Sequence, residues 1–225
     1  MTQSFSAIIF DCDGVLVDSE IIAVEIEMAA LAEIGLPYGL DEYKARFMGA
    51  STAAFHAAVD ADYLAKTGTA LPAGFRDLVR DRYRAAAHRL AAVPGARAAV
   101  EAVSLPKAVA SSSTEAALDE KLRLAALWDL FAPHIFSADH VANAKPAPDL
   151  FLYAADALKV DPCACLVIED SINGVTAARA AGMTAWGFTG GSHMDDATRR
   201  RLTAAGAARI VPDWADAARL FAALT

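Results

Sequence analysis

The sequence has only three cysteines, no basic tail and no apolar stretch long enough to cross a membrane. Cys163 and Cys165 are too close for an easy disulfide, and no His or Cys surrounds them at zinc-finger spacing. We therefore expect these two residues and Cys12 to be ordinary thiols in a reducing cytoplasm. The apolar N-terminal segment lacks a basic leader and is interrupted at Asp11, so we expect neither a signal peptide nor a membrane span.

The charge balance argues against one class of partner. The 28 acidic residues outnumber the 20 basic ones, which gives a net charge of −8. Without a basic stripe, the chain has no surface suited to binding a nucleic-acid backbone through counterion release. With 225 residues, of which 56% are hydrophobic and 21% charged, it fits a soluble globular protein of one or two domains.

The order of short apolar runs predicts an α/β fold. Several runs are typical of buried parallel strands, and helical stretches lie between them. The candidate strands are Ala7–Asp11, Lys107–Ala110, Ile135–Ser137, Leu166–Glu169, Thr184–Phe188 and Ala208–Val211. The candidate helices are Ala96–Val103, Thr114–Leu124, Pro148–Leu158, Ile172–Ala181, Asp196–Ala204 and Trp214–Ala223. This alternation predicts a Rossmann-like parallel sheet with helices on both faces.

One stretch of about 70 residues interrupts this alternation. It contains no convincing strand and has apolar residues at helical spacing. The first of three expected helices ends near Gly35, the second begins at Ser51, and a longer third one follows from Phe75. We therefore predict an inserted α-helical bundle domain at residues 19–89, within a core domain made of residues 1–18 and 90–225.

Two carboxylates one residue apart follow the first predicted strand. In Asp11-Cys12-Asp13-Gly14 the like charges repel each other, and burial of either one is costly. A bound divalent cation, or a reaction that uses both groups, would offset this cost. The segment therefore predicts a metal-assisted enzyme site near the N-terminus.

Further polar side chains follow other predicted strands or precede helices. Ser111 follows one strand, Glu169 and Asp170 follow another, and Lys145 lies shortly before a helix. In an open parallel sheet, ligands bind beyond the carboxyl ends of the strands, so we expect these groups to meet. Carboxylates suit Mg²⁺, a serine with helix N-terminal amides suits phosphate, and a lysine supplies a point charge. Together these groups favour phosphoryl transfer.

Four segments resemble, in order, the four motifs of the haloacid dehalogenase superfamily. They read Asp11-Cys-Asp13-Gly-Val-Leu-Val-Asp18-Ser, Val-Ala-Ser111-Ser-Ser, Ala-Lys145-Pro-Ala-Pro-Asp and Ile-Glu169-Asp170-Ser-Ile-Asn-Gly. The helical insertion after the first motif resembles the small helical cap of that superfamily. The chain is most similar to the phosphatase and β-phosphoglucomutase-like branch.

The resemblance implies a role for both aspartates of the first motif. Asp11 would be the nucleophile that forms an aspartyl-phosphate, and Asp13 would be the general acid and then the general base. Dehalogenating members of the superfamily lack this second aspartate and the metal carboxylates. Since both are present here, dehalogenation is disfavoured.

The resemblance also implies the binding residues. Phosphate would be bound by Ser111, Ser112 and catalytic Lys145, although capping of the next helix is the role we favour for Ser112, Ser113 and Thr114. Mg²⁺ would be held by Asp11, Asp13 through its backbone carbonyl, Asp170 and Glu169. The expected function is a cytoplasmic, Mg²⁺-dependent phosphatase acting on a small phosphorylated metabolite, such as a sugar or polyol phosphate. We expect no nucleic-acid or membrane partner, and a monomer or weak homodimer.

Substrate specificity is expected to come from the helical insertion. Arg46, Gly49 and Ser51 lie in a segment that resembles the substrate-contacting loop of related caps, although a structural salt bridge is an equal alternative for Arg46. Sugar-phosphate mutases of this branch carry a histidine and an arginine at positions that hold Ala23 and Thr52 here. This departure favours transfer to water over the mutase alternative.

Other interpretations fit the residues less well. A calcium loop of the EF-hand type needs glycine at its sixth position between helices, whereas Gly14 is fourth after a strand. A response-regulator receiver has its acidic pair and phosphoacceptor on different strands and has no cap. A lapsed, non-catalytic binding protein is disfavoured because every motif position is filled. Asp18 and Glu20 fit either a hinge or a helix start, and we interpret His193 as an ordinary loop residue that borders the site.

Overall fold

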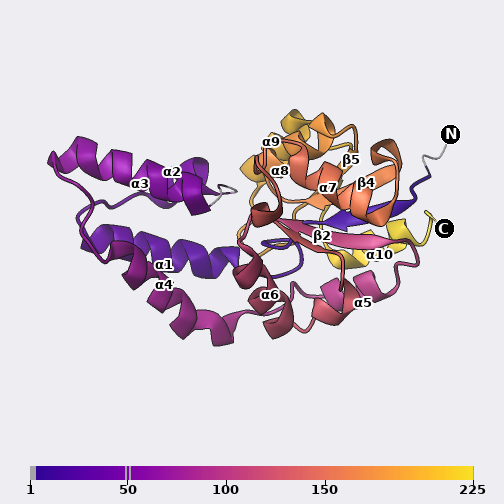
Figure 1. The fold of residues 1–225 in the computed structure, drawn as a ribbon, viewed down its shortest axis with the longest axis horizontal. Helices are drawn as coiled ribbons and strands as arrows, with labels where there is room; N and C mark the ends of the chain where they lie inside the picture. Colours follow the sequence, from indigo (N-terminus) through magenta and orange to yellow (C-terminus); the bar gives the residue numbers. More distant parts are fainter. Residues whose placement is uncertain (1–3, 49, 51, 225) are drawn as a thin grey trace.

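The computed structural model describes residues 4–48, 50 and 52–224. Within them, six parallel strands form one sheet in the order β3-β2-β1-β4-β5-β6 (Figure 1). The strands are β1 (Ala7–Phe10), β2 (Lys107–Ser111), β3 (Ile135–Ser137), β4 (Cys165–Glu169), β5 (Thr184–Phe188) and β6 (Arg209–Val211). The predicted α/β fold with a parallel sheet is confirmed.

Helices cover both faces of the sheet because its strands are apolar on both sides. Successive residues of β1 alternate between two hydrophobic clusters, with Ile8 and Phe10 in one and Ala7 and Ile9 in the other. The first cluster lies under α5 (Ala96–Glu101), α6 (Glu115–Leu124) and α10 (Trp214–Phe221). The second lies under α7 (Asp149–Leu158), α8 (Ile172–Ala180) and α9 (Asp196–Ala205).

The predicted boundaries differ from the observed ones by a residue or two. Asp11 lies just beyond β1, although its N–H still donates to Ile168 O of β4 at 2.9 Å. Ser111 is the last residue of β2, and β4 begins one residue earlier than predicted. Fraying ends move such boundaries without moving the strand core. The candidate site residues therefore remain at the carboxyl edge of the sheet.

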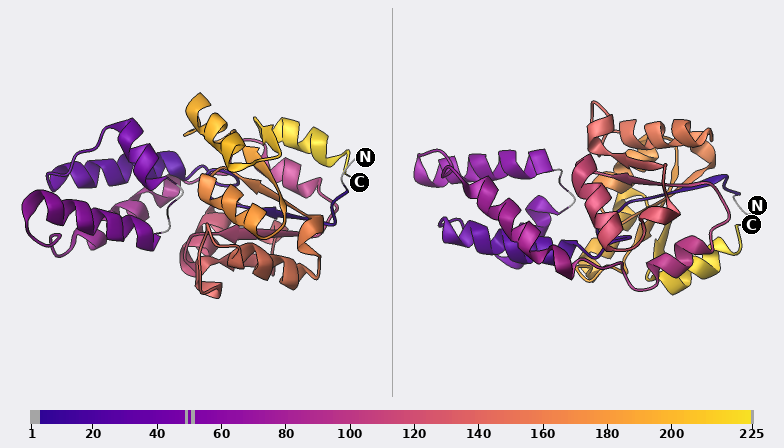
Figure 2. Two further views of the ribbon diagram at one scale, coloured as in Figure 1. Left: turned by 90° about the horizontal axis from the view of Figure 1, so that it is seen from above. Right: turned by 60° about the horizontal axis from the view of Figure 1, so that its bottom comes forward.

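Four helices between β1 and β2 form what we call the helical unit. They are α1 (Glu20–Glu33), α2 (Leu40–Phe47), α3 (Thr52–Thr67) and α4 (Phe75–Ala86). The unit has a hydrophobic cluster of its own, which includes Leu31, Phe47, Val59 and Val79. It lies at the carboxyl ends of the strands, whereas both chain termini lie at the opposite end of the sheet (Figure 2).

The prediction of three helices in this stretch was wrong, because α2 is an additional one. With eight residues and two buried side chains, Tyr43 and Phe47, α2 is too short to establish a helical period in the sequence. None of the helices in the described part of the chain is long and apolar enough to cross a membrane.

Candidate active site

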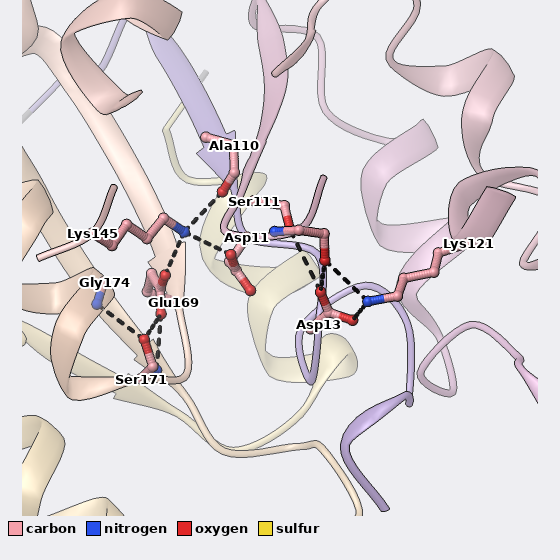
Figure 3. A network of polar contacts seen from close by, with 10 residues as sticks. Asp11, Asp13, Ala110, Ser111, Lys121, Lys145, Glu169, Ser171 and Gly174 are labelled. Carbon is pink, nitrogen blue, oxygen red and sulfur yellow. Dashed lines mark hydrogen bonds and ion pairs between the residues drawn. The ribbon is translucent and has the colours of Figure 1, made fainter. Parts of the chain in front are cut away.

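The predicted site residues of the four motifs meet at the carboxyl edge of the three neighbouring strands β2, β1 and β4 (Figure 3). Asp11 follows β1, Ser111 ends β2, and Glu169 ends β4, with Asp170 next to it. The chain runs from β1 to one side of the sheet and later returns to the other side at β4. Ligands of open α/β sheets bind at such a switch point.

Lys145 connects two of these strand ends. Its Nζ donates to Asp11 Oδ1 at 2.6 Å, to Glu169 Oε1 at 2.7 Å and to Ala110 O at 2.8 Å. Its side chain is only 2% exposed. Burial alone would lower the pKa of Lys145, but the charges of Asp11 and Glu169 outweigh burial and raise it above its usual value. Lys145 is therefore a fixed cation at the centre of the site.

Glu169 is held in one orientation by the start of α8. Its Oε2 accepts hydrogen bonds from the backbone N–H of Ser171 at 2.8 Å and from the Ser171 hydroxyl at 2.9 Å. A Cβ at position 174 would lie 1.7 Å from Glu169 Oε1, so only Gly174 allows the helix to approach this closely. Glu169 thus supplies a rigid negative charge beside Lys145.

Three buried carboxylates fit the magnesium site predicted from the sequence. Asp11, Glu169 and Asp170 each place one oxygen within 4.8 Å of the others. The pKa of Asp11 is raised well above its usual value, chiefly by burial and then by neighbouring carboxylates, although Lys145 opposes the shift. Burial and the charge of Glu169 likewise raise the pKa of Asp170. A hard dication with oxygen ligands would relieve this repulsion, so the donor set suits Mg²⁺.

Asp13 faces away from this cluster. Its carboxylate accepts hydrogen bonds from the Ser19 hydroxyl, from Ser113 Oγ at 2.9 Å and from Lys121 Nζ at 2.6 Å. Burial would raise the pKa of Asp13, but Lys121 and the two hydroxyls outweigh it and lower the pKa. Asp13 is therefore an ionised carboxylate, held one residue from Asp11 but bonded to different partners.

The serine-rich loop after β2 agrees only partly with the predicted capping. Ser113 bonds to Asp13, whereas Thr114 is the N-cap residue of α6 without a side-chain capping bond. Ser111 Oγ lies 3.5 Å from Asp13 Oδ2 and accepts from the N–H of Ser113 at 3.1 Å. Ser112 is partly exposed in the same loop.

Sequence reasoning missed Lys121 and undervalued His193. Lys121 lies on α6 between the buried Leu118 and Leu122, and this position at the edge of the buried face was an available signal. His193 is not an ordinary loop residue, since it is buried and its Nε2 lies 3.2 Å from Asp170 Oδ2. The sequence places His193 at the border of the site, but no sequence pattern predicts its burial or its contact with Asp170.

The predicted specificity segment is only partly described. Arg46 lies in α2 and forms an ion pair with Asp62 of α3. The structural salt bridge, left open from the sequence, is therefore the arrangement observed for Arg46. Gly49 and Ser51 lie outside the described residues.

Glu20 carries an unfavourable charge at the start of α1. Burial, followed by the charges of Asp170 and Asp13, raises its pKa to about 8. A carboxyl group with a raised pKa in the folded state favours its protonated form there. Its contribution therefore makes the protein less stable as pH rises from the unfolded pKa of 4.5 through about 8.

We expect Glu20→Gln to be more stable than the original chain at pH 8.5, by about 1 kcal/mol or more, or roughly 2–4 °C in Tm. The gap should close below pH 4.5, where Glu20 is neutral in both the folded and the unfolded state. Thermal unfolding in EDTA across this pH range measures the difference in stability between the variant and the original chain. Glu120→Gln, on the exposed side of α6, is the control. A difference in stability that does not change with pH would contradict the raised pKa of Glu20.

The match of the sequence to a protein-family model agrees with the arrangement of the four motifs around the site. The model described as haloacid dehalogenase-like hydrolase matches residues 5–182, which include all four motifs. The chain belongs to the haloacid dehalogenase-like hydrolase family. The resemblance seen in the sequence is therefore confirmed, as is the prediction of an enzyme.

Curated relatives of this hydrolase differ in length. The chloroplastic protein SUPPRESSOR OF QUENCHING 1 of Arabidopsis thaliana is 37% identical over 79% of this chain, but the match covers 17% of that protein. The bifunctional riboflavin kinase/FMN phosphatase of the same plant is 30% identical over 79% of this chain and 46% of its own length. The fructose-1-phosphate phosphatase of Escherichia coli is 30% identical, with 82% of this chain and 97% of that protein covered. The chain thus spans less than half of either plant relative.

Solved structures of the family have the same fold over nearly the whole of this chain. A conserved haloacid dehalogenase-like protein from Agrobacterium tumefaciens is 38% identical, with a TM-score of 0.84 and coverage of 98% of this chain and 99% of that one. A HAD family hydrolase from Deinococcus radiodurans, whose structure holds phosphate and sodium, is 36% identical and has a TM-score of 0.79. The match covers 99% of this chain and 98% of that one.

Proposed function

We propose that this hydrolase is a Mg²⁺-dependent phosphatase that acts on a small phosphorylated metabolite through an aspartyl-phosphate at Asp11. The observation that carries the proposal is the position of Asp11 at the end of β1, next to the fixed ammonium of Lys145. A nucleophilic carboxylate and an immobile cation at one strand end can hold a phosphoryl group in line for attack.

In the first half of the reaction, a carboxylate oxygen of Asp11 attacks phosphorus and the bond to the leaving oxygen breaks. Asp13 gives its proton to that oxygen, so an alcohol departs. Before substrate binds, Asp13 is ionised by its contact with Lys121. A bound phosphate dianion nearby would raise the pKa of Asp13 and allow it to take up this proton.

In the second half, Asp13 accepts a proton from water as the water oxygen attacks phosphorus. The bond between phosphorus and Asp11 breaks, which releases inorganic phosphate and regenerates the carboxylate. Ser111 and Lys145 would bind phosphate oxygens throughout. Asp11, Asp170 and the Asp13 carbonyl, with Glu169 beside them, would hold Mg²⁺, which would supply positive charge that offsets the carboxylates and the phosphoryl oxygens.

We assign residues 19–89, which comprise the helical unit and the segments around its helices, as a cap domain that covers the leaving group. Its own hydrophobic cluster and its place at the carboxyl edge of the sheet support this assignment. The contact of Ser19 with Asp13 ties the start of the unit to the catalytic loop. The similarity to a fructose-1-phosphate phosphatase favours a sugar or polyol phosphate as substrate.

A sugar-phosphate mutase is the second candidate, since a putative β-phosphoglucomutase from Thermotoga maritima shares the fold at 28% identity and a TM-score of 0.76. Ala23 and Thr52 replace the histidine and arginine of the mutases, which favours the phosphatase. Product analysis with β-glucose 1-phosphate and a bisphosphate primer separates the two, because isomerisation without phosphate release would establish the mutase.

The direct test is phosphate release from a panel of phosphorylated sugars, polyols and other metabolites, with Mg²⁺ or with EDTA. We expect release from at least one sugar or polyol phosphate, and only with a divalent cation. Equal release in EDTA, or no release from any ester, would overturn the proposal.

A further inference from the structure

His193 is a buried histidine that the proposed reaction does not use. It lies in the loop between β5 and α9, and its side chain is 3% exposed. Its Nε2 lies 3.2 Å from Oδ2 of Asp170, the carboxylate that follows Glu169. Its Nδ1 is buried and has no hydrogen-bond partner among the described residues. A buried N–H without an acceptor is costly, so the proton belongs on Nε2, where it faces Asp170.

Two glycines make room for this contact. Gly14 has a φ of +74°, and a Cβ there would lie 2.0 Å from Asp170 Oδ2 and 2.6 Å from His193 Cε1. A Cβ on Gly191 would lie 2.7 Å from Gly14 O and 2.9 Å from His193 Nδ1. The loops after β1 and β5 therefore pack tightly around the imidazole and the carboxylate. Such close packing leaves His193 and Asp170 little freedom to separate.

The loop that carries His193 is anchored from two sides. The N–H of Ser192 donates to Asp18 Oδ1 at 3.2 Å, and the Ser192 hydroxyl donates to the same carboxylate. Lys44 of α2 donates to His193 O at 3.0 Å, and its Nζ lies 3.5 Å from Asp195 Oδ2. Asp18 lies just before the helical unit, and Lys44 belongs to it. The helical unit thus holds the backbone of the residue that faces Asp170.

We propose that His193 is a positioning residue that donates from Nε2 to Asp170 and fixes that carboxylate for metal binding, and that Lys44 keeps His193 in place. The inference rests on the proposed function, in which Asp170 binds Mg²⁺. Hydrogen bonds to ligating carboxylates orient them, and loss of such a partner commonly weakens metal binding 10- to 100-fold. Docking of the helical unit and metal affinity would then be coupled through one backbone carbonyl.

The test is binding of Mn²⁺ to the 225-residue chain without substrate, with the free ion measured by electron paramagnetic resonance. His193→Leu keeps much of the volume but has no donor, and we expect about tenfold weaker binding. His193→Gln offers an amide N–H near the position of Nε2, and we expect it to stay within about threefold of the original affinity. The exposed His88 provides the control, since His88→Leu should not change the affinity.

Asp170→Asn separates failure of the inference from failure of the proposed function. If Asp170→Asn binds Mn²⁺ poorly and His193→Leu binds it normally, the inference is wrong while the metal site stands. If Asp170→Asn binds Mn²⁺ normally, the assigned metal site itself is wrong. Equal losses in His193→Leu and His193→Gln would show a purely structural role and would also overturn the inference.

Lys44→Met tests the connection to the helical unit. We expect roughly threefold weaker Mn²⁺ binding in this variant, and no further loss when it is combined with His193→Leu, because both changes act through the same contact. Normal binding in Lys44→Met, or losses that simply add in the double variant, would refute the role of Lys44.

Discussion

Asp11→Asn is expected to abolish phosphate release while the protein stays folded. The amide is a poor nucleophile, and loss of the nucleophile in covalent catalysis lowers kcat by a factor on the order of 10⁴ or more. Folding should not suffer, because the change removes one negative charge from a buried cluster that also contains Glu169 and Asp170. We expect the Tm in EDTA to be equal to or above that of the original chain.

The measurement pairs phosphate release on the best substrate with thermal unfolding of the same samples. Asp156→Asn, on the exposed side of α7, is the matched control and should retain full activity. Undiminished hydrolysis by Asp11→Asn would eliminate covalent catalysis at this residue. Inactivity together with a much lower Tm would instead mark Asp11 as a structural residue.

Lys145→Met is expected to lose both stability and activity. Removal of one partner from a buried ion pair costs about 3–5 kcal/mol, because the other charges remain buried without compensation. Here Asp11 and Glu169 would both lose an ammonium at 2.6 and 2.7 Å. The pKa of Asp11 would then be raised further, because Lys145 is the group that lowers it, so the variant should lose more stability as pH rises. We expect its deficit in unfolding free energy to be smaller at pH 5 than at pH 8.

Denaturant unfolding in EDTA measures this deficit, and Glu169→Gln supplies the companion variant. The double variant should be less destabilised than the sum of the two single variants, since neither partner then keeps an uncompensated charge. Additive losses would show that Lys145 and Glu169 do not stabilise each other. Full activity in Lys145→Met would remove this lysine from the phosphate site.

Much of the fold could be predicted because the sheet is buried on both faces. The continuous apolar runs of β1 and β4 have no other stable location than between helices. The short helix α2 could not be predicted, since its eight residues bury only Tyr43 and Phe47. Helices this short depend on tertiary contacts, which a single sequence does not display.

The site likewise contains residues that could be predicted from the sequence and a contact that could not. Asp11, Glu169 and Asp170 could be predicted because strand ends of a parallel sheet converge by topology, and Lys145 because the segment before α7 is expected to reach the same edge. Their mutual contacts confirm the convergence. The contact of Lys121 with Asp13 spans 108 positions along the chain, and it depends on the direction in which one side chain leaves α6 toward the loop after β1. The position of Lys121 at the edge of the buried face of α6 is a signal in the sequence, but no local pattern identifies Asp13 as its partner.

Borohydride trapping of the acyl phosphate tests the central claim most directly. The enzyme would be mixed with Mg²⁺ and its best substrate, quenched with borohydride during turnover, and digested for mass spectrometry. Because borohydride reduces an acyl phosphate to an alcohol, we expect homoserine at position 11, present only with Mg²⁺ and substrate and missing in Asp11→Asn. Rapid phosphate release with an unmodified Asp11, or with the reduced residue elsewhere, would contradict the account.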